Sequence, residues 1–230
     1  MTSKTTTISA NPVENLKAVL ARIEAARKTA IAPAREIHLV AVTKGHGRER
    51  ILPALEAGHR IFGENRVQEA KGKWPELRAA FPGVELHLIG PLQTNKVREA
   101  VALFDAIHSL DRLKLAEALK AELEKTGKSL QLFVEVNTGE EAQKLGIAPK
   151  ETVSFVRHCR DELTLPVVGL MCIPPVAEES ALHFALLQKL ARECGLSFLS
   201  MGMSEDFETA IRFAATHVRI GTAIFGEREN

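Results

Sequence analysis

The stretch His38-Leu-Val-Ala-Val-Thr-Lys44 decides the fold class of this chain. It is nearly continuous in apolar residues, which is typical of a parallel strand covered on both faces. Seven more short segments of this kind follow, and longer segments with helical spacing of apolar residues separate them. The predicted strands are 38–43, 60–62, 85–89, 105–108, 130–136, 167–170, 197–199 and 217–220. The predicted helices between them include 66–79, 113–124, 179–193 and 207–215.

The regular alternation of strands and helices predicts a barrel. The mean step from one strand start to the next is about 26 residues, which is the length of one βα unit. Eight such units predict an α/β protein with a single (β/α)8 TIM-type barrel and an additional N-terminal helix over residues 12–30. An open doubly wound sheet is the alternative architecture. No linker divides the chain, so we expect a flexible leader over residues 1–10 and one domain over residues 11–230.

Charge and composition exclude several classes of protein. The 230 residues include 30 Lys+Arg and 29 Asp+Glu, so the net charge of +1 gives no field that would recruit nucleic acid or an anionic membrane. We find no apolar run of membrane-spanning length and no secretory signal pattern. The three cysteines form no Cys-x-x-Cys pair, which argues against a disulfide framework. We therefore expect a cytoplasmic protein with no nucleic-acid or membrane partner.

Lys44 follows the first predicted strand directly. In a barrel of this type, chemistry belongs to the carboxyl ends of the strands and the loops that follow them. Burial disfavours the ammonium form of a lysine, and a neutral amine is what Schiff-base formation with a carbonyl requires. The alternative is a structural lysine whose amine reaches solvent at the end of the strand.

Gly45-His46-Gly47 after the first strand also allows a dinucleotide-binding interpretation. In that case Glu64, at the end of the next strand, would bind a ribose. The third glycine of the fingerprint is missing, because Arg50 stands in its place. The two glycines can equally well shape a tight turn between strand and helix.

The loops after the seventh and eighth predicted strands favour an anion site. Ser204 follows the seventh strand, and Gly221 and Thr222 follow the eighth. Barrels of this type commonly hold phosphate at these two loops with backbone N–H groups. The alternative for Ser204 is a helix N-cap, with Glu205 and Asp206 complementing the helix dipole.

Three polar residues near the predicted strands need partners. Arg219 lies within the last strand, where a buried guanidinium needs a carboxylate of the barrel or an atom of a ligand. Asn65 either caps a helix together with Gln68 or contacts a ligand. His87 lies in the middle of a strand and is interpreted as a core histidine. The eight histidines show no zinc-binding spacing and no G-x-S-x-G motif occurs, so no metal site or hydrolase triad is predicted.

Six motifs in chain order resemble the pyridoxal phosphate homeostasis proteins, which look like the barrel domain of alanine racemase standing alone. The motifs are LVAVTK (39–44), FGENRVQE (62–69), HLIGPLQTNK (87–96), GLMCIP (169–174), LSMGMS (199–204) and VRIGTAIFG (218–226). Together they extend over most of residues 10–228, and an ordered set of six is far more specific than a single motif.

The resemblance implies a pyridoxal 5′-phosphate site. Lys44 matches the lysine that holds the cofactor as a Schiff base. Ser204, Gly221 and Thr222 match positions around its phosphate, and Arg219 matches the arginine that faces the pyridine nitrogen. Asn65 and His87 belong to motifs that line the cofactor pocket. The sequence differs from the family at Gly45-His46-Gly47, where threonine and proline are usual, so the shape of this loop stays open.

The resemblance also implies a carrier or regulator of vitamin B6 rather than an enzyme. An arginine at the pyridine nitrogen weakens the cofactor as an electron sink. Racemization needs an acid/base group on each face of the substrate, and the second group of alanine racemases is a tyrosine from another domain. This chain contains no tyrosine and no residues for that domain, so we assign no catalytic residue and expect a monomer. Apoenzymes that use the cofactor are the candidate protein partners, and a racemase-like enzyme is the alternative function.

Overall fold

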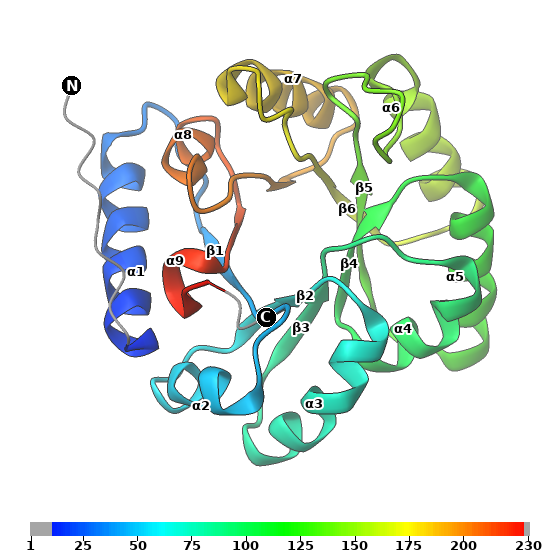
Figure 1. The fold of residues 1–230 in the computed structure, drawn as a ribbon. Coiled ribbons are helices and arrows are strands. Elements are labelled where there is room, and N and C mark those ends of the chain that lie inside the picture. Colours follow the sequence, from blue (N-terminus) through cyan, green and yellow to red (C-terminus); the bar gives the residue numbers. More distant parts are fainter. Residues whose placement is uncertain (1–10, 228–230) are drawn as a thin grey trace.

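Eight parallel strands close into a barrel in the computed structural model of this chain. They follow one another in chain order, and the last strand, β8 (His217–Ile220), closes the barrel by pairing with the first, β1 (His38–Val42). In Figure 1 the helices surround this ring of strands. The prediction of a TIM-type barrel is therefore confirmed, and the open doubly wound sheet is excluded.

The structure describes residues 11–227, so the leader predicted over residues 1–10 lies outside the described residues. The strands between the first and the last are β2 (Ile61–Glu64), β3 (Glu85–Leu88), β4 (Ala106–Leu110), β5 (Gln131–Glu135), β6 (Val167–Met171) and β7 (Phe198–Ser200). The helices are α1 (Pro12–Thr29), α2 (Arg48–Glu56), α3 (Val67–Ala80), α4 (Val97–Leu103), α5 (Leu113–Thr126), α6 (Pro149–Arg157), α7 (Ser180–Glu193), α8 (Phe207–Arg212) and α9 (Thr222–Phe225). A 3₁₀ turn (Thr94–Lys96) precedes α4, and a π-helical turn (His158–Glu162) follows α6.

The predicted strands differ from the observed ones only at their ends, by at most two residues. The helix predicted over residues 207–215 is shorter, because it ends at Arg212. Ala214 has a φ of 63°, in the left-handed region, which no residue of a right-handed helix adopts. Helix α2 was not singled out by its sequence pattern, which Pro53 interrupts inside the helix.

The core has two layers, one between strands and helices and one inside the barrel. Side chains alternate along a strand. On β8, Val218 and Ile220 belong to the large apolar cluster under the helices, while His217 and Arg219 occupy the alternate positions and are buried. Small apolar clusters fill part of the barrel interior: Val40, Val42 and Ile89, and Ala106, Phe133 and Met171. The interior of the barrel therefore holds buried polar side chains beside apolar ones.

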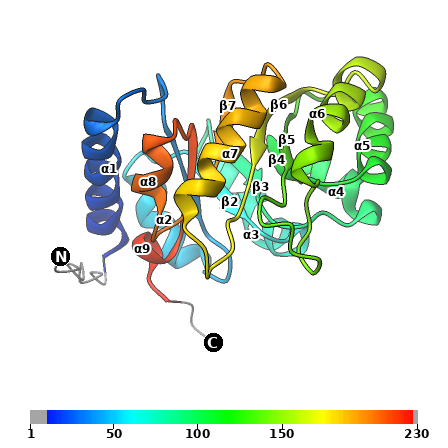
Figure 2. The same ribbon diagram turned by 90° about the horizontal axis from the view of Figure 1, so that it is seen from above.

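Helix α1 confirms the prediction of an additional N-terminal helix, and it packs against α8 and α9 (Figures 1 and 2). Asn11 caps it, since its side-chain oxygen accepts a hydrogen bond from the Val13 N–H at 2.9 Å. The Asn15 amide, on the buried face of the helix, donates a 3.0 Å hydrogen bond to the carbonyl of Ile224 in α9. Helix α1 thereby holds α9, which directly follows the last strand.

Candidate functional site

One pocket, with a volume of about 480 Å³, lies at the carboxyl ends of the strands. All six residues that the sequence singled out for a cofactor site line it: Lys44, Asn65, Ser204, Arg219, Gly221 and Thr222. They come from the segments after β1, β2 and β7 and from β8 with the turn that follows it. Parallel strands bring their carboxyl ends to one edge, which is why residues so far apart in the chain meet here.

Lys44 stands in the turn that joins β1 to α2. Thr43 before it is fully buried, and Lys44 is half-buried. Gly45 has a φ of 75°, which glycine adopts without strain and which turns the chain back toward α2. Val42 and Ile89 line the same pocket, so the lysine shares it with apolar side chains.

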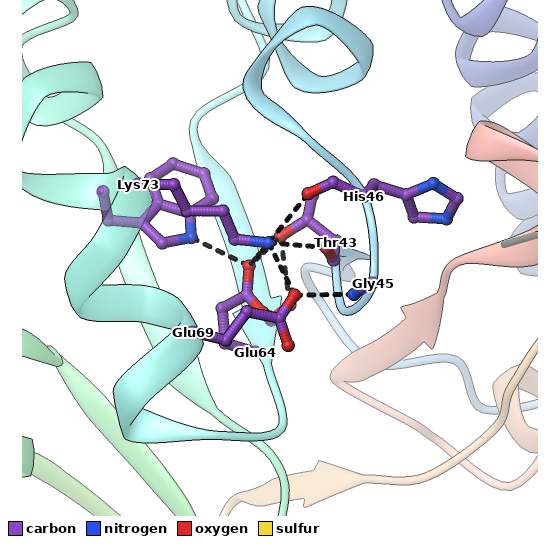
Figure 3. Close-up of polar contacts among 8 residues, drawn as sticks. Thr43, Gly45, His46, Glu64, Glu69 and Lys73 are labelled. Carbon is purple, nitrogen blue, oxygen red and sulfur yellow. Dashed lines mark hydrogen bonds and ion pairs between the residues drawn. The ribbon is translucent and has the colours of Figure 1, made fainter. Parts of the chain in front are cut away.

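Glu64 does not act as a ribose ligand. Its side chain is fully buried, and Oε1 accepts a 2.9 Å hydrogen bond from the Trp74 Nε1–H and another from the Thr43 hydroxyl (Figure 3). It does not line the pocket. Together with the closed barrel, this removes the dinucleotide-binding interpretation.

Arg219 reaches the pocket from inside the barrel, and only 4% of its surface is exposed. Its guanidinium donates to the Ser200 hydroxyl at 2.7 Å and to the carbonyl of Cys172 at 2.9 Å. Of the two partners that the sequence allowed, a barrel carboxylate or a ligand atom, the carboxylate is not among these hydrogen bonds, because both acceptors are neutral. Burial lowers the pKa of Arg219 from its ordinary value, and the more distant Glu135 and Asp206 act in the opposite direction. The pocket therefore contains a buried cation whose described contacts leave its charge uncompensated.

A chain of buried side chains continues behind Arg219 into the barrel. The Ser200 hydroxyl lies 2.8 Å from His108 Nδ1, and His108 Nε2 lies 3.1 Å from His87 Nδ1. His87 is thus a hydrogen-bonded core histidine, as the sequence suggested, and it does not line the pocket itself. Sequence reasoning missed Ser200 and His108. The sequence feature that could have indicated them is a polar residue within an otherwise apolar strand.

Glu135, at the end of β5, is the carboxylate most affected by this environment. Burial raises its pKa to about 7, the nearby Asp111 adds to the rise, and Arg219 acts against it. His108 behaves in the opposite way, because burial and the neighbouring His87, His217 and Arg219 hold its pKa well below the usual value. Near neutral pH, His108 is therefore neutral and Glu135 is about half protonated in the neighbourhood of Arg219.

The turn after β8 brings the backbone close to β1. A Cβ atom on Gly221 would lie 3.0 Å from the carbonyl oxygen of Val42, so glycine is required for this approach. Gly221 is the N-cap of α9, and the first N–H groups of a helix have no intrahelical acceptor. Thr222, the first residue of α9, adds a hydroxyl to this wall of the pocket.

Ser204 is not a helix N-cap. Helix α8 begins at Phe207 with Asp206 as its N-cap, and Ser204 stands in the turn before it. Asp206 Oδ1 accepts a 2.7 Å hydrogen bond from the Met203 N–H, which fixes this turn. Glu205 and Asp206 both line the pocket, so carboxylates lie on the same wall as the Ser204 hydroxyl.

Asn65 does not cap a helix either. Helix α3 begins at Val67 with Arg66 as its N-cap, which moves the capping position one residue beyond Asn65. Among the described residues, the buried Asn65 Oδ1 has no hydrogen-bond partner. A Cβ on Gly90 would lie 2.4 Å from the Asn65 carbonyl oxygen, so the chain packs tightly behind this residue. An unpaired buried acceptor at a pocket wall is suited to a donor on a ligand.

Within residues 11–227, no helix combines the length and the apolar character needed to cross a membrane. The same residues bring together no group of three or more His, Cys, Asp or Glu side chains that could hold a metal ion. Cys159, Cys172 and Cys194 are free cysteines.

The barrel and its pocket define a protein of the alanine racemase N-terminal-domain class. The family model described as alanine racemase, N-terminal domain, matches residues 15–229. Solved alanine racemases share the fold, and the Acinetobacter baumannii protein superposes with a TM-score of 0.70 at 19% identity, covering 93% of this chain and 61% of that one.

Relatives of similar length are closer in sequence. The pyridoxal phosphate homeostasis protein of Pseudomonas aeruginosa is 42% identical over 94% of this chain and 95% of its own, and that of Escherichia coli is 36% identical over 94% and 96%. The structure of PipY from Synechococcus elongatus with PLP bound superposes with a TM-score of 0.80 at 33% identity, covering 94% of this chain and all of PipY. The chain belongs to the pyridoxal phosphate homeostasis protein family.

Proposed function

We propose that this chain binds pyridoxal 5′-phosphate in the pocket at the carboxyl ends of the strands and serves in intracellular homeostasis of that cofactor. The observation that carries the proposal is the meeting of a lysine, a buried guanidinium and a glycine turn in one pocket. Relatives named for pyridoxal phosphate homeostasis and the PLP-bound PipY structure support it.

The residues of the pocket fit this cofactor. Helix α9 has no side-chain cap, which suits binding of a phosphate by the backbone N–H groups of its first turn. Asn65 Oδ1 supplies an unpaired acceptor, and Arg219 supplies a charged donor whose described partners are neutral. A phosphorylated heterocycle offers groups that match all three.

Lys44 is the residue that we assign to the covalent bond. The cofactor supplies an aldehyde when it is bound. With its amine neutral, Lys44 Nζ bonds to the aldehyde carbon, and its two protons leave with the aldehyde oxygen as water, so the resulting Schiff base needs no further reactant. Addition of water reverses the bond, which suits storage and release.

We assign the other pocket residues to binding the cofactor, without a covalent bond to it. We assign Ser204, Gly221 and Thr222 to the phosphate and Arg219 to the pyridine nitrogen, with Asn65 at the pocket wall. A guanidinium beside that nitrogen disfavours its protonation and so weakens the electron sink that amino-acid chemistry requires. The sequence also contains no tyrosine to act as a second acid/base group. A reversible carrier without catalytic turnover is the function that this arrangement supports best.

The test is a visible absorption spectrum of the purified protein with added pyridoxal 5′-phosphate, followed by borohydride reduction and peptide mass mapping. We expect a Schiff-base band and the cofactor mass on Lys44, and we expect Lys44→Ala to lose both. Label scattered over surface lysines would contradict the assignment. The same samples incubated with L-alanine and D-alanine test the racemase alternative, which predicts conversion that depends on Lys44.

A further inference from the structure

An ionic cluster lies beside the turn that carries Lys44, and two of its three side chains are buried (Figure 3). It consists of Glu64 at the end of β2 and Glu69 and Lys73 on α3. Lys73 Nζ lies 2.8 Å from Glu64 Oε1 and 2.9 Å from Glu69 Oε1. The side chains of Glu64 and Lys73 are 0% and 8% exposed, so this pair is almost completely withdrawn from water.

The cluster binds the residues on both sides of Lys44. Lys73 Nζ donates to the carbonyl of Thr43 at 2.8 Å and to the carbonyl of His46 at 3.1 Å. Glu69 Oε1 accepts from the Gly45 N–H at 2.6 Å, and Glu64 Oε1 accepts from the Thr43 hydroxyl. Thr43, Gly45 and His46, the neighbours of Lys44, therefore each donate to or accept from the cluster.

Stability alone is a weak reason for such an arrangement. Withdrawing a carboxylate and an ammonium from water costs about as much as their attraction returns, and apolar side chains of the same size are often no worse. Burial raises the pKa of Glu64, while Lys73 and the donors Thr43 and Trp74 act against that rise. Unlike apolar packing, an ionic cluster forms directional hydrogen bonds, and each of these bonds fixes the position of one backbone group.

The segment between β1 and α2 depends on such hydrogen bonds for a fixed backbone. It contains two glycines, Gly45 in the left-handed region and Gly47, so its sequence leaves the backbone many conformations. None of Glu64, Glu69 and Lys73 lines the pocket, so the cluster cannot act on a ligand directly. The hydrogen bonds to Thr43, Gly45 and His46 are the contacts through which the cluster can act on the turn that carries Lys44.

We propose that Glu64, Glu69 and Lys73 are positioning residues that fix the turn over residues 43–46 and thereby set where Lys44 presents its amine in the pocket. This inference rests on the proposed bond between Lys44 and the cofactor aldehyde. Misplacing a reacting atom by about 1 Å slows a reaction by up to roughly a hundredfold, so a loosened turn should slow bond formation.

The test uses two variants and a matched control. Glu69→Ala removes the acceptor of the Gly45 N–H and leaves the buried Glu64–Lys73 pair in place. The double variant Glu64→Gln/Lys73→Met removes both charges of the buried pair together and leaves Glu69, whose side chain is 30% exposed, bonded to the Gly45 N–H. Lys71→Met is the control, because Lys71 lies two residues from Lys73 on the same helix but pairs with Glu99 at the surface.

Three measurements separate positioning from folding. The rate at which the Schiff-base band appears reports Lys44, and the affinity for pyridoxine 5′-phosphate, which lacks the aldehyde, reports the rest of the pocket. Hydrogen exchange of the Gly45 amide in the ligand-free protein reports the turn itself. We expect both variants to form the band about ten- to a hundredfold more slowly, with faster Gly45 exchange and unchanged affinity for pyridoxine 5′-phosphate, while Lys71→Met matches the parent.

The outcomes distinguish this inference from the function on which it rests. If the parent protein forms no band at Lys44, the proposed function fails. If the parent forms it and both variants form it equally fast, the positioning role fails. If both variants lose affinity for pyridoxine 5′-phosphate as much as they lose the band, the cluster supports the whole pocket rather than the lysine, and the inference is wrong.

Discussion

At the scale of single residues, the two cations of the pocket are held in different ways. Lys44 is half-buried on a glycine-containing turn. Its neighbours are held by hydrogen bonds to the cluster of Glu64, Glu69 and Lys73. Arg219 is buried within a strand and held by two neutral acceptors. This difference agrees with the proposed roles, in which Lys44 changes its bonding state and Arg219 keeps its position and its charge.

Replacing Thr222 by valine should weaken cofactor binding without affecting the fold. The variant keeps the shape of the side chain and removes a hydroxyl from the pocket wall. A hydrogen bond to a charged group contributes about 1.5–3 kcal/mol, so we expect a dissociation constant roughly ten- to a hundredfold higher for pyridoxal 5′-phosphate. Fluorescence or absorbance titration measures it. Thr29→Val at the end of α1, whose hydroxyl bonds only helix carbonyls, is the control and should bind like the parent.

Glu135 makes the stability of the protein depend on pH. Its pKa in the folded protein is about 7, above the ordinary value of 4.5, so folding favours its protonated form. That contribution is complete below pH 4.5 and is lost as the pH rises through 7, at about 1.4 kcal/mol for each pH unit in between. We therefore expect Glu135→Gln to be more stable than the parent at pH 8, by about 2–3 kcal/mol.

Urea unfolding of the parent and of Glu135→Gln at pH 5 and pH 8 measures this difference. The two proteins should unfold at similar urea concentrations at pH 5 and separate at pH 8. Glu117→Gln on α5 removes an exposed carboxylate and should show no such separation. Equal midpoints for Glu135→Gln and the parent at pH 8 would show that Glu135 carries no penalty when ionised.

At the scale of elements, the site is made by the turns that leave the strands. The turn after β1 carries Lys44, and the turn after β8 carries Gly221 and Thr222. These two strands pair with each other, with Ala41 opposite Ile220, so their turns leave the barrel side by side. The close approach of Gly221 to Val42 is the contact that joins the two turns.

Gly221→Ala should therefore disturb both turns. Its Cβ would lie 3.0 Å from the Val42 carbonyl oxygen and 3.2 Å from Val42 Cβ, so the α9 turn must move away from β1. We expect at least tenfold weaker retention of pyridoxal 5′-phosphate and a loss of about 1–3 kcal/mol in the free energy of unfolding, the usual cost of overpacking. Thermal unfolding and cofactor titration measure the two effects.

Gly72→Ala is the matched control for this variant. Gly72 lies inside α3, and a Cβ there would meet nothing within 4 Å. Alanine in a helix is more stable than glycine by about 0.5–1 kcal/mol, so this variant should unfold at a slightly higher temperature with unchanged binding. If both substitutions had the same effect, the contact between Gly221 and Val42 would contribute neither to stability nor to cofactor binding.

At the scale of the whole molecule, the sequence predicts which residues meet but not how they are supported. Strand ends can be found from apolar runs, and a parallel barrel brings them to one edge, so Lys44 and Thr222 were expected at the same end of the barrel. The common site that also includes Asn65 was implied by the family resemblance. The support depends on side-chain packing between distant segments. The contact between His108 and Ser200 joins residues 92 apart, and no local pattern indicates it.

The structure excludes the helix-cap alternatives that local sequence allowed for Asn65 and Ser204. Each residue stands before a helix and is of a type that caps helices, so local sequence favours that role. In the structure the two helices begin at Val67 and Phe207, so the capping positions fall on Arg66 and Asp206. The two residues are thereby left in the pocket wall.

The histidines inside the barrel connect these observations to the stability of the whole molecule. His108 and His217 are buried, and burial holds the pKa of each well below the usual value of 6.5. The rings of His217 and His38 lie 4.8 Å apart, and His87 bonds to His108, so the group extends from the start of β1 to Ser200 behind Arg219. His108 and His217 therefore bind protons more readily in the unfolded chain than in the folded protein.

Acid should therefore destabilise the fold through this group. Because the folded pKa values are lowered, their contribution is present above pH 6.5 and is lost as the pH falls below it, at up to about 1.4 kcal/mol per pH unit for each histidine. His108→Leu removes one such group but leaves the Ser200 hydroxyl and His87 Nδ1 without their partner, at a cost of about 1–3 kcal/mol. In urea unfolding, the deficit of this variant against the parent should be largest at pH 8 and should shrink at pH 5.5. A deficit that is constant across this range would mean that His108 takes up its proton inside the folded barrel as readily as in the unfolded chain, and that the buried histidines do not set the acid limit of the fold.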